Sequence, residues 1–388
     1  MNVYFDNAAT TALDKDVFDA MVPYMLEYFG NPSSAHTYGR KTRAAVENAR
    51  LTVAESIGAN PDEIYFTSGG TEGDNTAILS AVRGLGSKHI ITSRLEHHAV
   101  LNTVKSLAKN AEITLHFLDN DVNGNLDLAQ LEGLLQKLPR AFVSLMHGNN
   151  EIGNLNDIER IGNLCKANNA LFHTDTVQTM GHFRFDLSEL NVDFLVGSAH
   201  KFHGPKGVGF LYVRNSVNVS PLLYGGSQER GVRAGTENVA GIVGLAKALE
   251  VAYSGFDSHR NFISHLKRCC LQKLQSRFPS VVFNGNSGSI DRSMHTVISA
   301  SFPSTRQHLL SYLDTKGIAA SGGSACTSGA ASSHVLTALG AETGKQVLRF
   351  SFSRFNSVQE IDYLIQQLAD VTDLQLKPES LLYETSTT

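Results

Sequence analysis

Short apolar runs recur between residues 64 and 213 and predict buried strands. The runs occupy residues 64–67, 89–92, 113–116, 142–146, 171–174, 194–197 and 208–213. Segments with apolar positions three and four residues apart separate several of these runs, as at 76–82 and 158–164, and they predict helices. This alternation of strands and helices predicts an α/β layer fold with a mostly parallel sheet.

The pattern changes after residue 254. A long helical pattern over 262–274 is followed by two further apolar runs that again predict strands. We therefore expect a large domain over residues 15–254 and a smaller α+β domain built from residues 1–14 and 255–388. A chain of 388 residues is long enough to form two such cores.

Composition argues against several classes of protein. Apolar residues make up 42% of the chain and charged residues 18%, which is typical of a globular enzyme, and the formal net charge is −4. No long basic block indicates nucleic-acid binding, and no apolar run is long enough to span a membrane. The N-terminus lacks the features of a secretory signal, and the four cysteines include no Cys-x-x-Cys pair of a zinc or redox site. We expect a cytoplasmic enzyme with no metal, no direct nucleic-acid contact and no membrane contact.

One lysine stands in an unusual setting. Lys201 belongs to the run Ser198-Ala199-His200-Lys201, which lies between the apolar runs 194–197 and 208–213. A lysine held in a tight turn between two buried strands is not an ordinary surface lysine, and it can form a Schiff base with a carbonyl compound. The alternative is a turn at Gly204-Pro205 that carries the lysine incidentally.

Polar residues follow several of the predicted strands. Small and hydroxylic residues around Thr71 open a helix, where backbone N–H groups and the helix dipole favour a phosphate. Asp175 and His97 each follow a strand, and Asn150 is placed similarly, at the edge where parallel sheets collect ligands. Asp175 could pair with a pyridinium nitrogen, and His97 could stack on a ring or move protons. The alternatives are a Thr71-x-x-Asp74 capping box, a helix N-cap at Asp175 and a structural histidine.

A second unusual segment surrounds Cys326. Between residues 321 and 333, every residue except this cysteine is small or hydroxylic. Such a segment cannot pack in a core and predicts a mobile loop. A cysteine on such a loop predicts a working thiol, and the alternative is a chance cysteine in a linker.

Taken together, these segments resemble the cysteine desulfurases of the NifS/IscS type, which belong to aminotransferase class V. The resemblance runs nearly from end to end, and the longer cysteine loop is typical of the NifS/IscS branch. The segments that carry it are residues 4–11, 30–36, 96–97, 149–151, 175–178, 198–201, 228–238, 321–333 and 349–351. One departure is Gly73, which stands where relatives usually carry a serine.

The resemblance implies a fold-type I enzyme that binds pyridoxal 5'-phosphate, with a seven-stranded sheet in its large domain. Lys201 would be the Schiff-base lysine and would carry the proton of the substrate Cα. Asp175 would pair with the pyridinium nitrogen, Gln178 would hydrogen-bond the phenolate oxygen, and His97 would stack on the ring and move protons. The phosphate would be bound by Thr71, Ser198, His200 and, from the neighbouring subunit of a homodimer, Thr236.

The resemblance also implies the reaction. Arg349 would clamp the carboxylate of L-cysteine, with Asn150 and Asn7 nearby, and Cys326 would accept the sulfur as a persulfide. L-alanine would leave, and the sulfur would pass to an acceptor protein for iron–sulfur cluster assembly or thiolation. Alternatives are a selenocysteine lyase or a class V aminotransferase, which need Lys201 but not Cys326, and a non-catalytic binding protein in a sulfur relay.

Overall fold

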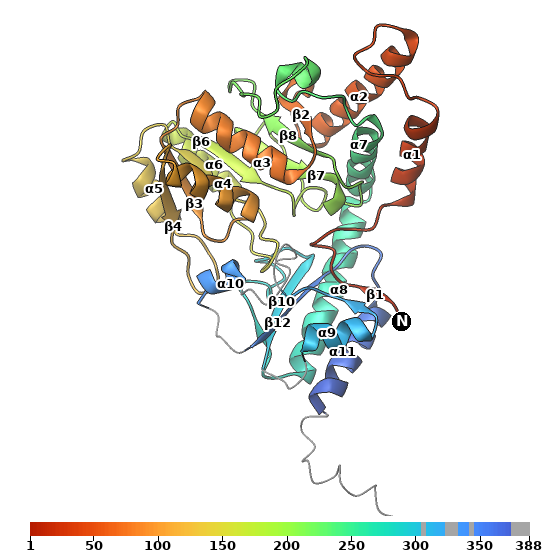
Figure 1. The fold of residues 1–388 in the computed structure, drawn as a ribbon. Helices are drawn as coiled ribbons and strands as arrows, with labels where there is room; N and C mark the ends of the chain where they lie inside the picture. The colour runs from red at the N-terminus through yellow and green to blue at the C-terminus, as the bar shows by residue number, and fades with distance from the viewer. Residues whose placement is uncertain (304–307, 323–332, 341–344, 374–388) are drawn as a thin grey trace, which may run out of the picture. The chain divides into compact units, whose positions relative to one another are not determined.

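The structure is a computed structural model that describes residues 1–303, 308–322, 333–340 and 345–373 (Figure 1). The chain forms two compact units. The larger unit contains residues 10–150 and 155–259, and the smaller unit contains residues 1–9, 151–154 and 260–388. The predicted domain boundaries, after residues 14 and 254, differ from this division by a few residues. The sequence pattern gives no sign that 151–154 belongs to the smaller unit.

In the described part of the larger unit, seven strands form one sheet in the order β2-β8-β7-β6-β5-β3-β4. The strands are β2 (Ile64–Thr67), β3 (His89–Ser93), β4 (Thr114–Leu118), β5 (Phe142–Ser144), β6 (Leu171–Asp175), β7 (Phe194–Ser198) and β8 (Gly209–Val213). Strand β8 runs antiparallel to both of its neighbours, and all other neighbouring pairs are parallel. The prediction of an α/β fold with a mostly parallel, seven-stranded sheet is confirmed.

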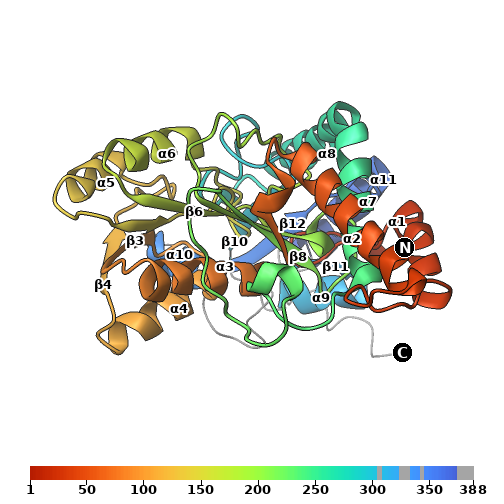
Figure 2. The ribbon, with the colours of Figure 1, turned by 90° about the horizontal axis from the view of Figure 1, so that it is seen from above.

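Helices cover both faces of this sheet, because alternate side chains of each buried strand point to opposite faces. The helices of the larger unit are α1 (Lys15–Leu26), α2 (Thr37–Ser56), α3 (Gly70–Leu79), α4 (His98–Lys109), α5 (Leu128–Leu135), α6 (Ile158–Ala167) and α7 (Val239–Ser254). Phe172 and Leu195 belong to the core beneath α2, α5, α6 and α7. Phe194 and Val196 belong to the separate core beneath α3 and α4. Figure 2 shows α6 and α4 on opposite sides of the sheet.

The topology brings several chain segments to one edge of the sheet. Strands β2 and β7 are both antiparallel to β8, so they run in the same direction as each other and as β3, β5 and β6. The carboxyl ends of these five strands therefore meet at the same edge. The residues that follow them include Thr71, His97, Asn150 and Lys201, and Asp175 ends β6 itself. This edge is where open α/β sheets place their ligands.

The smaller unit has an α+β architecture. Its described strands form a three-stranded sheet, β12-β10-β9, and a two-stranded parallel sheet, β1-β11. The elements are β1 (Val3–Tyr4), β9 (Val282–Phe283), β10 (Val297–Phe302), β11 (Ile318–Ala319), β12 (Gln346–Ser351), α8 (Phe256–Arg277), α9 (Leu309–Thr315), α10 (His334–Ala338) and α11 (Val358–Asp373). The buried side chains of Phe5, Leu266, Phe350 and Leu364 belong to its core.

None of the helices in the described ranges is long and apolar enough by itself to cross a membrane. The consecutive helices α7 and α8, which meet at a bend of 76°, pass the length and composition test only as a pair.

Candidate active site

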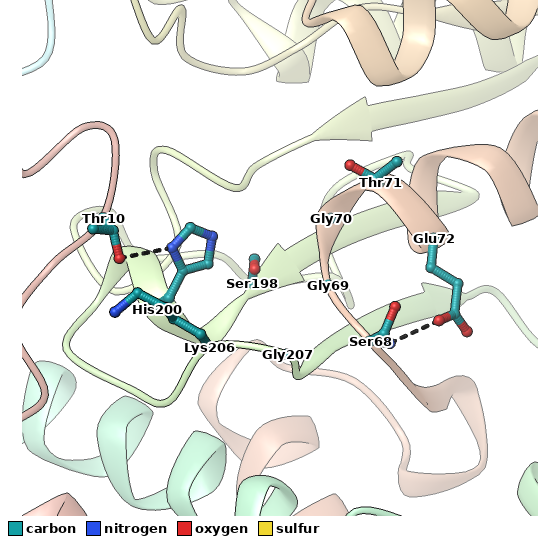
Figure 3. Close-up of a pocket in the computed structure, with 10 residues that line it drawn as sticks. All are labelled: Thr10, Ser68, Gly69, Gly70, Thr71, Glu72, Ser198, His200, Lys206 and Gly207. Atoms are coloured by element: carbon teal, nitrogen blue, oxygen red, sulfur yellow. Dashed lines mark hydrogen bonds between the residues drawn. The ribbon is translucent and has the colours of Figure 1, made fainter. Parts of the chain in front are cut away.

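A pocket of about 330 Å³ opens at the carboxyl edge of the larger unit's sheet (Figure 3). Its walls come from the turn after β2, the turn between β7 and β8, and the chain just before α1. The lining residues are Thr10, Ser68, Gly69, Gly70, Thr71, Glu72, Ser198, His200, Lys206 and Gly207. Three of the predicted phosphate-binding residues, Thr71, Ser198 and His200, therefore share one pocket.

Glycines shape the wall contributed by α3. The helix begins at Gly70, and its N-cap residue Gly69 has φ +152°, a backbone conformation that favours glycine. A Cβ on Gly70 would lie only 2.7 Å from Val177 Cγ2. The alternative, a Thr71-x-x-Asp74 capping box, is wrong, because the N-cap residue is Gly69, which provides no side-chain cap, and Asp74 is buried inside the helix. The first N–H groups of α3 thus have no intrahelical partner, and they can bind an anion.

The opposite wall adds hydrogen-bonding groups. His200 Nδ1 lies 3.1 Å from Thr10 Oγ1, and the His200 ring and Ser198 lie across the pocket from Gly70 and Thr71 (Figure 3). Burial, together with the charges of Lys201 and Lys206, lowers the pKa of His200 to about 4, so its imidazole is neutral at pH 7.

Glu72 is an acid among these lining residues, and its carboxylate is already engaged. Its Oε1 accepts from Arg233 Nε at 3.0 Å and its Oε2 from the Ser68 N–H at 2.9 Å. Burial alone would raise the pKa of Glu72, but the bonds from Arg233 and Ser68 lower it. The pocket therefore offers its hydroxyls, N–H groups and the lysine charge to a bound anion.

Lys201 occupies the tight turn that the sequence predicts. It ends a short 3₁₀ turn, Ala199–Lys201, directly after β7, and the Gly204 N–H returns to Ala199 O at 2.9 Å. The positive charge of Lys201 lowers the pKa values of both Asp175 and His200. The bond from Gly204 closes the backbone around Lys201 and keeps this residue at the carboxyl edge of the sheet.

Asp175 is a buried carboxylate at the end of β6. Its Oδ1 accepts from the Val177 N–H at 2.8 Å within a short turn, so it is not the N-cap of an α-helix. Burial and the neighbouring Asp74 raise the pKa of Asp175 to about 7, against the opposing effects of the Val177 N–H, His173 and Lys201. A cation bound beside Asp175 would favour its ionised form.

His97 lies close to this carboxylate. A ring nitrogen of His97 and one carboxylate oxygen from each of Asp175 and Asp74 all lie within 4.8 Å of one another. His97 also caps α4, because its Nδ1 accepts from the Ala99 N–H at 3.1 Å. The alternative of a structural histidine is therefore correct for Nδ1, the nitrogen that caps the helix. Gln178 is partly buried in the turn that follows Asp175.

Thr71, Ser198 and His200 are the only predicted site residues, among those that the structure describes, that line this pocket. Thr236 is exposed, and Asn150 follows β5 in a partly buried turn. In the smaller unit, the buried Arg349 of β12 donates from Nη2 to Asp6 Oδ1 at 2.8 Å. Asn7 donates from Nδ2 to Ser351 O at 2.8 Å, which ties the N-terminal segment to β12. Cys326 lies outside the described residues.

Comparison with known proteins places the chain in a family. It matches the aminotransferase class-V family over residues 3–364. A cysteine desulfurase IscS of Dictyoglomus turgidum is 42% identical over 378 residues, which cover 96% of this chain and 94% of that protein. The chain belongs to the class V cysteine desulfurase family. A cysteine desulfurase of a Nostoc species is also 42% identical, over 96% of this chain and 93% of its own length.

Solved structures agree with this membership. A NifS-like protein superimposes with a TM-score of 0.89 at 35% identity, covering 96% of this chain and all of its own. SspA, solved in complex with cysteine, has a TM-score of 0.78 at 32% identity over 92% of this chain. The predicted resemblance is confirmed. Enzymes of this family depend on pyridoxal 5'-phosphate, which is therefore the cofactor of this chain.

The residues of the larger unit fit this cofactor. Pyridoxal 5'-phosphate has an anionic phosphate, a basic ring nitrogen and an aldehyde. The glycine-shaped wall of α3 and the hydroxyl of Ser198 suit the phosphate. The buried carboxylate of Asp175 suits a protonated ring nitrogen, and Lys201 is the amine at the same edge.

The structure also reveals residues that sequence reasoning missed. Thr10 and Lys206 line the pocket, although only Lys206 has a sequence signal, its place in the same turn as Lys201. Asp74 is a buried carboxylate beside Asp175, and its Thr71-x-x-Asp74 spacing indicates a cap instead. The unusual Gly73 has a steric reason here, because a Cβ would lie 2.8 Å from Val196 Cγ1.

Proposed function

We propose that this enzyme removes the sulfur of L-cysteine and passes it to Cys326 as a persulfide, with release of L-alanine. The observation that carries the proposal is 42% identity to relatives named cysteine desulfurase, sustained over 96% of this chain. The similarity to SspA, which was solved with cysteine bound, supports the choice of substrate. Cys326 and Lys201 are both present in the motifs that the resemblance assigns to this chemistry.

The larger unit supplies the residues that act at the substrate Cα. When bound, pyridoxal 5'-phosphate supplies an electron sink that makes the Cα hydrogen acidic. Asp175, ionised beside the protonated ring nitrogen, would maintain that sink, and His97 would lie against the ring. Lys201 would take the Cα proton and return it. Gln178 would donate a hydrogen bond to the phenolate oxygen.

Other residues would hold the two anionic groups in place. Thr71, Ser198 and His200 would bind the cofactor phosphate together with the first N–H groups of α3. Arg349 would bind the carboxylate of L-cysteine through two parallel hydrogen bonds, with Asn150 and Asn7 nearby. These contacts would orient the substrate so that its amino group, its Cα hydrogen and its sulfur face reacting groups.

The sulfur step balances without an added oxidant. The thiolate of Cys326 attacks the sulfur of the substrate, an S–S bond forms, and the substrate C–S bond breaks. The electron pair of that bond, with a proton, becomes the new C–H bond of alanine. L-cysteine and a thiol thus become L-alanine and a persulfide. Ionising an ordinary cysteine thiol at pH 7 requires about 2 kcal/mol, so the enzyme must assist the deprotonation of Cys326.

The proposal includes a cytoplasmic homodimer that delivers sulfur to an acceptor protein. Thr236 is exposed and absent from the lining of its own pocket, which supports a role in the pocket of a second copy. Large apolar side chains are exposed over α1 and the start of α2, and a second copy would bury them. They are Phe18, Met25, Leu26, Phe29 and Tyr38. The acceptor would serve iron–sulfur cluster assembly or thiolation.

One experiment tests the activity. The purified holoenzyme is given L-cysteine, L-selenocysteine or an amino-donor and keto-acid pair, each with a reducing thiol. We expect alanine and sulfide in equal amounts from L-cysteine, and no new amino acid from the keto acid. Alanine from selenocysteine alone would indicate a lyase, amino-group transfer would indicate an aminotransferase, and no turnover would indicate a relay protein. Sedimentation of the holoenzyme tests the homodimer.

A further inference from the structure

Two buried polar atoms, one on Asp74 and one on His173, face each other next to Asp175. Asp74 lies on α3 one turn after Thr71, and its side chain is fully buried. Its Oδ1 is 3.4 Å from Nε2 of His173, which is buried on β6. Among the described residues, neither of these two atoms has a hydrogen-bond partner. Unsatisfied polar atoms of this kind are rare in folded proteins, so the pair requires an explanation.

The position of the His173 ring is fixed from its other side. Nδ1 lies 2.9 Å from Ser144 Oγ on β5, and the ring stacks on Phe142 with an interplanar angle of 11°. Because the ring cannot turn away, one proton between Asp74 and His173 would satisfy both facing atoms. If Asp74 carries it and donates to Nε2, the Nδ1–H can donate to Ser144, and no charge is buried in the chain of three residues.

The charges around Asp74 favour this neutral form. The groups that face it are Asp175 and His173 of β6, and Glu96 and His97 before α4. Three carboxyl groups buried together cannot all be ionised. Burial raises the pKa of Asp74 to about 8, and burial raises the pKa of Glu96 well above its usual range.

Two ionisable residues of β6, His173 and Asp175, also belong to this cluster. Burial lowers the pKa of His173 to about 4, so its ring is uncharged at neutral pH. Asp175 differs from Asp74 because it accepts from the Val177 N–H and feels the charge of Lys201. Glu96 also accepts an N–H, that of Met146 at 2.9 Å, so the charge of Lys201 is what favours Asp175 as the carboxyl group of this cluster that ionises.

We propose that Asp74 is a positioning residue for the cofactor, a neutral acid that donates its proton to His173 and thereby leaves Asp175 as the ionised carboxylate beside the ring nitrogen. This role rests on pyridoxal-phosphate binding and not on which amino acid the enzyme consumes. Asp74 does not touch the reacting atoms, and it acts by controlling where the buried negative charge lies.

The test compares holoenzymes of wild type, Asp74→Asn and Thr174→Val. Asparagine keeps the shape and an N–H donor for His173 but has no acidic proton. We expect Asp74→Asn to bind pyridoxal phosphate within about threefold of wild type at pH 7, with the same visible spectrum. In titrations from pH 6 to 10, the cofactor absorbance of wild type should show one more alkaline ionisation than that of Asp74→Asn. Thr174→Val changes the neighbouring residue of β6, whose side chain points to the other face, and should titrate like wild type.

Two results would overturn the proposal. One is a folded Asp74→Asn protein whose cofactor affinity at pH 7 falls more than about tenfold, which would mean that Asp74 works ionised. The other is an unchanged alkaline ionisation in Ser144→Ala, because this variant removes the acceptor for His173 Nδ1–H and should move that ionisation to lower pH. If Asp74→Asn does not fold, the alkaline ionisation of Ser144→Ala alone tests the proposal. Since neither readout measures alanine, an error in the proposed substrate would leave both unchanged.

Discussion

Arg50 and Glu229 form a buried, two-pronged ion pair. Nη1 lies 2.8 Å from Oε2 and Nη2 lies 2.7 Å from Oε1, and each side chain is only 3% exposed. Glu229 Oε2 also accepts the N–H of Phe66 at 2.8 Å, so the pair fastens the segment before α7 to strand β2. Glu229 and Arg230 have φ values of 43° and 56°, which are unfavourable for residues with side chains. The ion pair holds this strained backbone, from which the chain continues to Thr236.

Glu229→Gln should lower the free energy of unfolding by about 3 kcal/mol, because the buried Arg50 loses its two-pronged buried partner and keeps only the more exposed Glu47, 3.1 Å from its Nε. Urea denaturation of the holoenzyme measures this loss. The matched control is Lys15→Ala, which breaks the exposed pair of Lys15 with Asp19 and should leave the midpoint unchanged. A Glu229→Gln protein as stable as the control would mean that the pair does not anchor the segment.

Lys201→Ala should lower alanine formation about a thousandfold or more, because it removes the amine that is assigned to move the Cα proton. The visible absorbance of the cofactor should also change. In wild type, borohydride should fix the cofactor covalently to the peptide that contains Lys201, as mass spectrometry would detect. Lys137→Ala, which changes an exposed lysine, is the control. Fixation on Lys206, the lysine that lines the pocket, would contradict the assignment.

Cys326→Ala should keep its colour, bind L-cysteine and exchange the Cα hydrogen with solvent, yet form almost no alanine. The substitution removes the nucleophile after the Cα step, so kcat should fall far more than KM changes. The other cysteines lie in α6 and α8, where Cys165 and Cys270 are buried, and they should not replace it. Cys269→Ser is the control and should retain activity. Near-normal alanine formation by Cys326→Ala would refute the persulfide step.

Lys267 provides a test of pH dependence in the smaller unit. Its buried Nζ donates to Ser293 Oγ at 2.6 Å and to Met294 O at 2.8 Å, with Ser289 O farther away at 3.4 Å. Burial lowers the pKa of Lys267 to about 7, whereas the amine of the unfolded chain is protonated up to about pH 10. Between these values the unfolded chain binds more protons, so stability should rise with pH.

Lys267→Met should remove this rise. In wild type, the group contributes a slope of up to about 1.4 kcal/mol per pH unit between pH 7 and 10, and below pH 7 the slope disappears. Urea denaturation at several pH values measures the difference between the two proteins. Lys109→Met, at an exposed position of α4, should titrate like wild type. Equal slopes for all three proteins would show that Lys267 stays protonated in the folded enzyme.

The strands were predictable because the apolar runs that form them are local. The run at 194–197, for example, forms β7 (Phe194–Ser198). Lys201 is predictable as a site residue because it lies just after this strand in the sequence. Asp175 and His97 carry the same signal, a polar residue just beyond a strand. Asp74 carries a misleading one, because its burial depends on how α3 packs on β6 and β7, which no local pattern records. The crossing of 151–154 into the smaller unit depends on long-range contacts in the same way.

The pairing of β1 with β11 has a consequence for biosynthesis. Val3 pairs with Ile318 and Tyr4 with Ala319, so these two residues must wait for partners that are translated 315 positions later (318 minus 3, and 319 minus 4). Until then the N-terminal strand is an unpaired edge, and such edges attract other chains. Contacts between such distant residues also close slowly. Loss of residues 3–4 and release of the chain before residue 318 would therefore damage the same two-stranded sheet, and a nascent chain would depend on protection from aggregation until β11 is made.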